Sequence, residues 1–191
     1  RELTYHRPQI IIVPNGSPYY LGKAAYRFDL VTTIALELQS DVCYVNQVGG
    51  NDDLIFDGRS FYVNRDGRCI AAAKPYQEQI VMVDTDSKQY VTYPMGGDSV
   101  DLRDALVLSI KDYARKQNVP FTGAVIPLSG GIDSAVTACL AVDAFGRENV
   151  EGIGLPCAPF SSEGSVADAE ALAKNLGISF RVIPITEIYE A

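Results

Sequence analysis

Apolar residues follow two different spacings in the first part of the chain. Residues 9–13 form an apolar run that predicts a buried strand, and residues 42–45 predict a second one. Between them, from residue 22 to 38, apolar side chains recur on one face of a helix, and Arg27 is expected off that face. The pattern therefore predicts a strand–helix–strand unit.

Short apolar stretches separated by Asp-Gly pairs come next. Such pairs favour tight turns between antiparallel strands. We therefore expect an antiparallel meander with strands at residues 54–56, 60–63, 69–73 and 79–84.

Helices and strands alternate from residue 101 to the end of the chain, which implies a parallel, doubly wound sheet with right-handed crossovers. Asp101 and Ser165 are predicted as N-caps of the first and last of its helices. Pro127 cannot donate to a strand ladder, so a bulge or break is expected there. The predicted elements are helices 101–116, 134–145 and 165–176 and strands 124–128, 149–155 and 180–185.

Residues 86–100 show no periodicity and are rich in turn formers, so the domain boundary is placed there. The expected layout is one domain portion over residues 1–87, a linker over 88–100 and a second domain portion over 101–191. The first residue is not Met and the last residues carry no closing signal, so we expect a piece of a longer polypeptide.

Composition and charge exclude several classes. With 47% hydrophobic and 21% charged residues the chain is not disordered. The net charge of −8 argues against a nucleic-acid surface, because phosphate neutralisation needs Lys and Arg. No apolar run reaches the roughly 20 residues of a membrane span, and no signal peptide is expected. We expect no nucleic-acid or membrane partner.

Cysteine and histidine usage disfavours two kinds of site. The four cysteines form no C-x-x-C pair, and His6 is the only histidine, so a zinc site and a His-based triad are disfavoured. Cys43 lies within an apolar strand and is expected to be a structural thiol. Scattered thiols of this kind favour a cytoplasmic location.

The loop between the predicted strand 124–128 and the following helix carries the strongest chemical signal. Its sequence is Ser129-Gly130-Gly131-Ile132-Asp133-Ser134. Paired glycines let the backbone approach an anion, and the amides at the helix start favour negative charge. The loop lacks the Lys of a Walker A motif. A carboxylate would repel phosphate directly, so Asp133 predicts a bridging Mg²⁺. We expect a pyrophosphate cradle rather than a simple turn.

This loop resembles the S-G-G-x-D-S signature of the PP-loop ATP pyrophosphatases. Residues 161–165 and 168–178 are similar to the corresponding segment of glutamine-dependent NAD synthetases. The first half resembles the C-terminal part of the nitrilase-like glutaminase domain of those enzymes, in segments 14–19, 44–52 and 56–61. The resemblance implies an α/β chain in which the end of an α-β-β-α sandwich precedes a Rossmann-like PP-loop domain.

The resemblance also implies a reaction. ATP adenylates deamido-NAD, pyrophosphate leaves, and ammonia taken from glutamine displaces AMP to give NAD. The resemblance places ATP at Ser129, Gly130, Gly131, Ile132, Asp133, Ser134 and Leu155, with Mg²⁺ at Asp133 and Glu163. It also implies Ser17, Lys23 and Arg27 in a glutamine pocket, and assembly as a homo-oligomer.

Several alternatives stay open at this point. The Glu, Lys and Cys of a nitrilase-type centre would precede residue 15, so no catalytic residue is assigned within this chain and the isolated chain is expected to be inactive. Residues 157–160 depart from the family pattern ahead of Ser161. The chain could also come from another PP-loop enzyme, of the GMP synthetase or tRNA-modifying type, or be a non-catalytic nucleotide-binding fragment.

Overall fold

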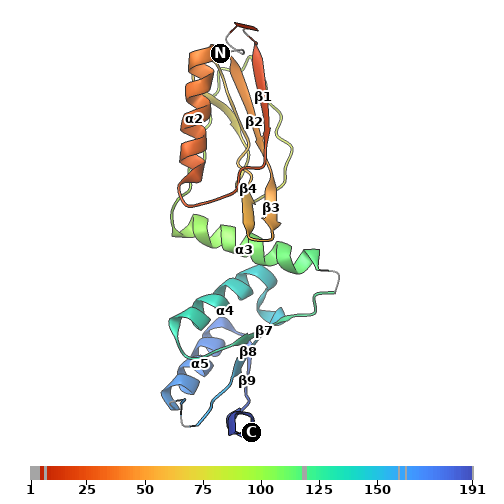
Figure 1. Cartoon of the computed structure of the whole chain (residues 1–191). Helices are drawn as coiled ribbons and strands as arrows, with labels where there is room; N and C mark the ends of the chain where they lie inside the picture. Colours follow the sequence, from red (N-terminus) through yellow and green to blue (C-terminus); the bar gives the residue numbers. More distant parts are fainter. Residues whose placement is uncertain (1–4, 7, 118–119, 159, 162, 191) are drawn as a thin grey trace. The chain divides into compact units, whose positions relative to one another are not determined.

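The computed structural model describes the chain except for residues 1–4, 7, 118–119, 159, 162 and 191. It divides into two compact units, residues 1–112 and 113–191, which we treat separately (Figure 1). The division falls within helix α3 (Ser99–Lys116), so most of this helix packs with unit 1. None of the helices in the described residues is both long and apolar enough to cross a membrane.

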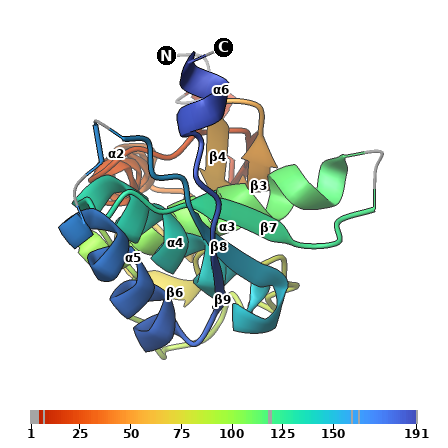
Figure 2. The ribbon, with the colours of Figure 1, turned by 90° about the horizontal axis from the view of Figure 1, so that it is seen from below.

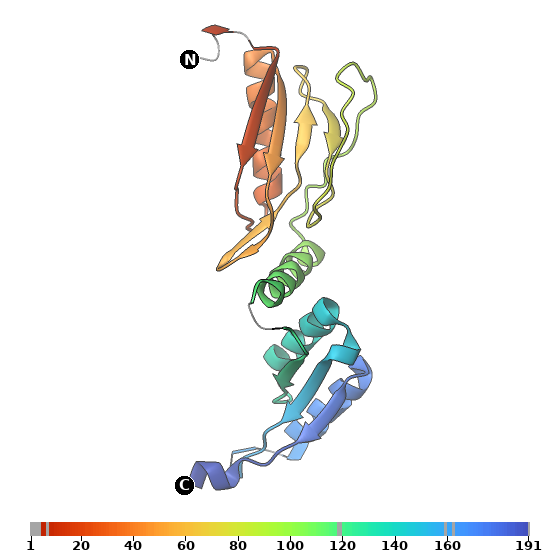
Figure 3. The ribbon, with the colours of Figure 1, turned by 90° about the vertical axis from the view of Figure 1, so that its right-hand side faces the viewer.

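Unit 1 is built on a four-stranded sheet in the order β1-β2-β5-β6. The parallel pair β1 and β2 is connected by helix α2, which lies along one face of the sheet (Figure 3). The remaining strands pair antiparallel, and β3 and β4 form a separate hairpin. The elements are β1 (Ile10–Asn15), α2 (Lys23–Leu38), β2 (Asp41–Asn46), β3 (Val48–Asn51), β4 (Leu54–Asp57), β5 (Phe61–Val63) and β6 (Cys69–Ala72).

The core of unit 1 lies between α2 and the sheet. Small and β-branched side chains of α2, among them Ala24, Val31 and Ala35, pack against buried residues of β2 and β5. The predicted helix is confirmed, but the expectation that Arg27 lies off its buried face is wrong. Arg27 is only 3% exposed, because a carboxylate on β4 pairs with it.

No strand forms at residues 79–84. Val81, which is 39% exposed, and the half-buried Val83 line, together with Cys43, a hollow of about 140 Å³ over the sheet. Ile80 and Met82 point into solvent, at 94% and 89% exposure. Successive side chains of this segment therefore alternate between the hollow and solvent, as in a strand. The segment nevertheless lies over the face of the sheet and is not hydrogen-bonded to a neighbouring strand.

The predicted linker is anchored in the core of unit 1. Tyr93 is 4% exposed, stacks on Phe28 with ring centroids 4.6 Å apart, and meets the edge of Phe61 at 4.8 Å. Aromatic packing of this kind fixes the chain in front of α3. The turn formers in residues 88–100 thus mark the end of helices and strands, while the segment itself stays packed against unit 1.

Unit 2 is a three-stranded parallel sheet in the order β7-β8-β9. Helices α4 and α5 pack on the same face of this sheet (Figures 1 and 2), as right-handed crossovers between neighbouring strands require. The alternating α/β order with a parallel sheet is confirmed. The elements are β7 (Ala124–Pro127), α4 (Ile132–Phe145), the 3-10 turn η1 (Arg147–Asn149), β8 (Val150–Gly154), α5 (Glu163–Leu176), β9 (Ser179–Val182) and α6 (Thr186–Glu190).

Three local expectations are wrong. Pro127 causes no bulge, because it is the last residue of an edge strand whose register with β8 is unbroken, and the next amide, of Leu128, continues the pairing. Asp101 lies inside the first turn of α3, where its carboxylate is buried in an ion pair. Ser165 lies two residues inside α5 and does not begin it.

The two tyrosines of the predicted linker allow a test of this anchoring. Replacing Tyr93 by Ala removes a buried ring from the core and is expected to lower the opening free energy of α2 by about 3–5 kcal/mol. Tyr90→Ala is the matched control, because Tyr90 is 49% exposed. Within the described residues, the one cation–π or ring contact found for Tyr90 is with the Arg68 guanidinium. Amide hydrogen exchange of residues 24–38 measures both, and equal protection in the two variants contradicts the anchoring.

Candidate functional site

The turn from β7 into α4 is shaped by one close backbone approach. Gly130 has a φ of +79°, which favours glycine. A Cβ atom on Gly130 would lie 2.6 Å from the carbonyl oxygen and 2.9 Å from the Cα of Ser165 in α5. The first glycine of the pair is therefore required by conformation and by space, and it brings the turn against the beginning of α5.

The two serine side chains of the turn are in contact with each other. Their Oγ atoms lie 3.1 Å apart, and the Ser134 hydroxyl also donates to the Gly131 carbonyl at 3.0 Å. The Gly131 amide donates to the Ser129 hydroxyl at 3.3 Å, and the Ser129 amide to the Ser134 hydroxyl at 3.2 Å. These bonds hold both hydroxyls at the start of α4. Each hydroxyl has one hydrogen, which is used within the turn, so donation to a ligand requires a hydroxyl to rotate away from its present acceptor.

The start of α4 has the features of an anion site. Gly131 is its N-cap residue, and within the described residues no side chain caps the helix. The first amides of such a helix lack intrahelical partners and carry the positive end of its dipole. Ile132 is 75% exposed and Asp133 is exposed as well, so this end of the helix faces solvent.

A cleft of about 310 Å³ opens beside this turn, at the carboxyl ends of β7 and β8. Ser129 and Leu155 both line it, so the structure brings these two predicted residues together. Ser161 also lines the cleft, and its hydroxyl accepts the Cys157 amide at 2.9 Å, which closes the loop after β8. The remaining lining residues are Pro127, Leu128, Gly154, Pro156, Phe160, Ser165 and Val166.

A magnesium ion fits this turn only with ligand oxygens supplied by a nucleotide. No group of three or more His, Cys, Asp or Glu side chains gathers anywhere in the described part of the chain. Asp133 offers one exposed carboxylate in the first turn of α4. Mg²⁺ is commonly held by one or two carboxylates together with phosphate oxygens and water, so Asp133 is a suitable single ligand. Glu163 begins α5, but its side chain lies outside the described residues.

The three residues weakly expected in a glutamine pocket have different surroundings. Ser17 is held by Asn46, which accepts its amide at 2.8 Å and donates to its carbonyl at 3.2 Å. The Lys23 ammonium lies 4.8 Å from the ring centroid of Tyr20 at the exposed start of α2. Arg27 is buried in an ion pair, so its guanidinium is committed to the protein interior.

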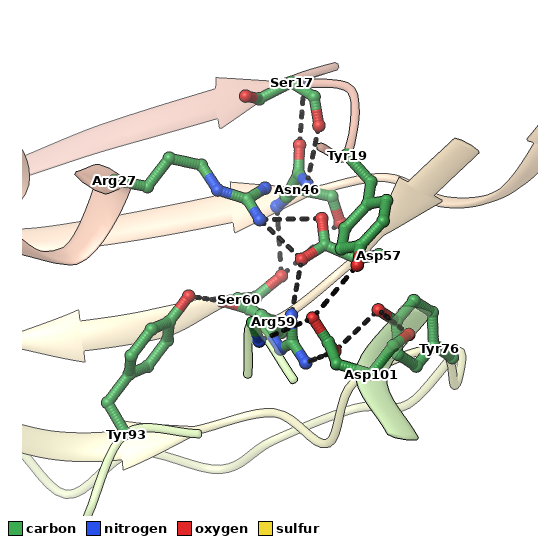
Figure 4. Close-up of polar contacts among 11 residues, drawn as sticks. Ser17, Tyr19, Arg27, Asn46, Asp57, Arg59, Ser60, Tyr76, Tyr93 and Asp101 are labelled. Atoms are coloured by element: carbon green, nitrogen blue, oxygen red, sulfur yellow. Dashed lines mark hydrogen bonds and ion pairs between the residues drawn. The ribbon is translucent and has the colours of Figure 1, made fainter. Parts of the chain in front are cut away.

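This ion pair is part of a buried chain of alternating charges that the sequence does not signal (Figure 4). Arg27 Nη2 contacts both carboxylate oxygens of Asp57, at 2.7 and 2.5 Å. Asp57 also accepts Arg59 Nη1 at 3.0 Å, and Arg59 pairs in turn with Asp101 at the start of α3. Two guanidinium groups and two carboxylates thus neutralise each other in the interior, as buried charges require.

The thiols of unit 1 are not activated. Burial raises the pKa of Cys43 above its ordinary value and that of Cys69 to about 11. A thiol with a raised pKa supplies little thiolate at neutral pH and is a poor nucleophile. The interpretation of Cys43 as a structural residue agrees with this environment.

The paired glycines of the turn provide a matched test of its geometry. Gly130→Ala is expected to destabilise unit 2 by about 1–3 kcal/mol, because the new methyl group meets the Ser165 backbone in a strained conformation. Gly131→Ala should be tolerated, since Gly131 has a φ of −89° and its nearest contact would be the Ser129 hydroxyl at 3.4 Å. Amide hydrogen exchange of residues 124–182 measures the stability of unit 2. Equal destabilisation by both substitutions would contradict the close packing of Gly130 on the Ser165 backbone.

Comparison with known proteins supports the sequence interpretation. Residues 102–191 match the family model for NAD synthase. The whole chain aligns with the glutamine-dependent NAD(+) synthetase of Aquifex aeolicus at 38% identity, covering 40% of that protein. The Synechocystis enzyme of the same name is 43% identical over 94% of this chain and 33% of its own length.

A solved structure gives the same result for the fold. The glutamine-dependent NAD(+) synthetase of Acinetobacter baumannii, in complex with ADP, superposes with a TM-score of 0.84 at 33% identity, covering 99% of this chain and 36% of that one. The chain thus spans 33–40% of the length of these relatives. These matches do not favour another type of PP-loop enzyme. The resemblance to glutamine-dependent NAD synthetases is confirmed along the chain, with the match to the NAD synthase family model over residues 102–191.

Proposed function

We propose that this chain is a segment of a glutamine-dependent NAD synthetase and that unit 2 supplies its ATP site. In the proposed reaction the nicotinate carboxylate of deamido-NAD attacks the α-phosphorus of ATP, and pyrophosphate leaves with the bonding electron pair. Ammonia, released from glutamine elsewhere in the enzyme, then attacks the acyl adenylate. AMP departs, a proton is lost from nitrogen, and the amide of NAD is formed.

The observation that carries this proposal is the Ser129–Ser134 turn beside the cleft at the strand ends. Ligands in open α/β sheets bind outside the carboxyl ends of the strands. The amides at the start of α4 are positioned to donate to phosphate oxygens, and the Ser129 and Ser134 hydroxyls would donate as well once they rotate away from their acceptors within the turn. Such preorganised donors stabilise the negative charge that develops on a leaving pyrophosphate.

Asp133 and Leu155 take the two other roles in this proposal. Asp133 would hold Mg²⁺, which supplies positive charge to the phosphates when bound. Leu155, at the end of β8, lines the cleft and offers an apolar contact to the adenine ring. The A. baumannii relative was solved in complex with ADP, which supports an adenine nucleotide as a ligand of the full-length protein.

For unit 1 we propose the C-terminal part of a nitrilase-like sandwich. The sheet face opposite α2 is apolar and only partly covered by residues 79–83, with Ile12 at 70% and Val45 at 45% exposure. A second sheet packed on this face would bury these side chains, as in an α-β-β-α arrangement. A second helical layer on unit 2, which the doubly wound fold needs, is proposed on the same grounds because Val125 is exposed on the face away from α4.

The domain limits of 1–87 and 101–191, with a linker between them, remain predictions. So do the glutamine contacts of Ser17 and Lys23, a homo-oligomeric assembly and a cytoplasmic location. Arg27 is proposed to support the glutamine pocket from inside the protein, since its side chain is enclosed with Asp57.

The test is the product balance of the full-length protein. Incubation with deamido-NAD, ATP, Mg²⁺ and either glutamine or ammonia should give NAD and AMP in equal amounts. Ser129→Ala should lower the ammonia-dependent rate by about 100-fold or more, because it removes a donor to the leaving group. Ser161→Ala is the comparison variant, because it makes the same change at another serine that lines the cleft, one whose hydroxyl accepts the Cys157 amide. Formation of ADP in place of AMP, or no NAD from ammonia, refutes the proposal.

A further inference from the structure

A side chain takes over where the pairing of β1 with β2 ends, at Asn15 and Asn46. The Gln47 amide still donates to the Asn15 carbonyl, at 3.2 Å. Beyond that point Asn46 Oδ1 accepts the Ser17 amide at 2.8 Å, and Asn46 Nδ2 donates to the Ser17 carbonyl at 3.2 Å (Figure 4). One side-chain amide, with a donor and an acceptor, thus binds both backbone groups of Ser17, as a neighbouring strand would.

Asn46 is itself held firmly from the other side of the sheet. It is 7% exposed, and the Ser60 hydroxyl, just before β5, accepts its backbone amide at 3.0 Å and donates to its carbonyl at 3.4 Å. Ser60 is in turn tied to the chain after β6, because its carbonyl accepts the Ala73 amide at 2.7 Å. The Asn46 side chain therefore cannot turn away without leaving buried polar groups unpaired, which costs free energy.

The backbone of Ser17 has little freedom left. Pro18 follows it, and a residue before proline is biased toward extended conformations. The next amide, of Tyr19, donates to the Ile55 carbonyl at 2.6 Å, which fixes the chain on the far side of the proline. With its own amide and carbonyl bound by Asn46, Ser17 is held in one orientation at the end of β1.

The hydroxyl is the one polar group of Ser17 that the fold leaves unused. Among the described residues none forms a hydrogen bond with Ser17 Oγ, although the amide and the carbonyl of Ser17 are both bonded. A hydroxyl can donate to a carboxylate or accept from an ammonium group, and free glutamine carries both. A hydroxyl on a fixed backbone also loses less freedom when a ligand binds, which favours affinity.

Asn64, at the other end of β5, shows what an asparagine does when it serves only its own turn. Its Oδ1 accepts the amides of Asp66 and Arg68 at 3.2 and 2.9 Å, both within four residues along the chain. Contacts of this kind shape a local turn. Asn46 instead reaches a residue 29 positions away, so its hydrogen bonds decide the orientation of Ser17 and not that of its own turn.

We propose that Asn46 is a positioning residue for glutamine, which holds the Ser17 backbone so that the Ser17 hydroxyl meets the substrate. This inference rests on the proposed function and on the glutamine contact predicted for Ser17. Asn46 does not touch the ligand but fixes the group that does. Without Asn46 the Ser17 hydroxyl has to be ordered each time glutamine binds, so affinity falls. All of these contacts lie within unit 1, and NAD synthesis from free ammonia does not use them.

The experiment measures the KM for glutamine and the ammonia-dependent rate of NAD formation in the full-length protein. Asn46→Ala removes the side-chain amide, and Ser17→Ala removes the hydroxyl that it positions. The double variant Ser17→Ala/Asn46→Ala tests whether the two side chains act as one. Asn64→Ala is the matched control, because it makes the same change at an asparagine that also binds two backbone groups.

Ser17→Ala and Asn46→Ala should each raise the KM for glutamine about tenfold, as expected when a hydrogen bond to a charged ligand group is lost. The double variant should stay within about twofold of the single variants, whereas independent effects would multiply to about 100-fold. Asn64→Ala should keep the wild-type KM. The ammonia-dependent rate of Asn46→Ala should stay within about twofold of wild type, which a general loss of folding would not allow.

A wild-type KM in either single variant overturns the inference, and so does a double variant in which the two effects multiply. An equal rise of the KM in Asn64→Ala overturns it as well, because the effect would then reflect stability alone. If Asn46→Ala does not fold, Asn46→Asp decides in its place, since it keeps the shape and replaces the donor to the Ser17 carbonyl by an acceptor. A wild-type protein that makes no NAD from ammonia instead refutes the proposed function.

Discussion

The approach of Gly130 to the Ser165 backbone sets the geometry on which the candidate nucleotide site depends. Only a residue without a Cβ can place the chain this close to α5 with a φ of +79°. That approach turns the chain from the end of β7 into α4 and leaves the first turn of α4 facing solvent. The two serine hydroxyls then meet at 3.1 Å, beside a cleft that is ready to accept a polar ligand.

Unit 1 is organised by a different constraint, the need of buried charges for partners. Arg27, Asp57, Arg59 and Asp101 come from different elements and satisfy each other only when those elements are assembled. Removing one member would strand the charge of its neighbour in the interior. The same chain of charges holds the segment before α3, and Tyr93 anchors that segment with an aromatic ring. The stretch between the predicted domains is thus an ordered part of the first unit.

Local patterns predicted the elements whose causes are local. The apolar spacing over residues 22–38 predicted α2, and the predicted end of the next helix but one at residue 145 is the end of α4, which Gly146 follows. The Ser129–Ser134 turn could be placed from its sequence, because glycine conformation and helix capping depend on adjacent residues. The cleft beside the turn needed only the rule that parallel strands end at one edge.

The predictions that were wrong depend on contacts between residues far apart in the sequence or on the place of a strand in the sheet. Arg27 was expected off the buried face because its partner Asp57 lies thirty residues away along the chain. Asp101 is of a usual N-cap type, but α3 begins at Ser99, the Asp98 carboxylate accepts the Asp101 amide at 2.8 Å, and the Asp101 carboxylate is used by Arg59 and Tyr76. Residues 79–84 alternate like a strand, yet pairing depends on which neighbours the sheet offers. Pro127 caused no bulge because β7 ends there at the sheet edge. Periodicity cannot supply any of these facts.

The most direct test of the central claim is a titration of the isotope-labelled 191-residue chain with ATP and Mg²⁺, followed by amide NMR. The account predicts that the largest shift changes fall on residues 129–134 and 154–155, and that they grow when Mg²⁺ is added to ATP. Shift changes confined to other parts of the chain, or none at millimolar nucleotide, would show that this turn does not bind the phosphates.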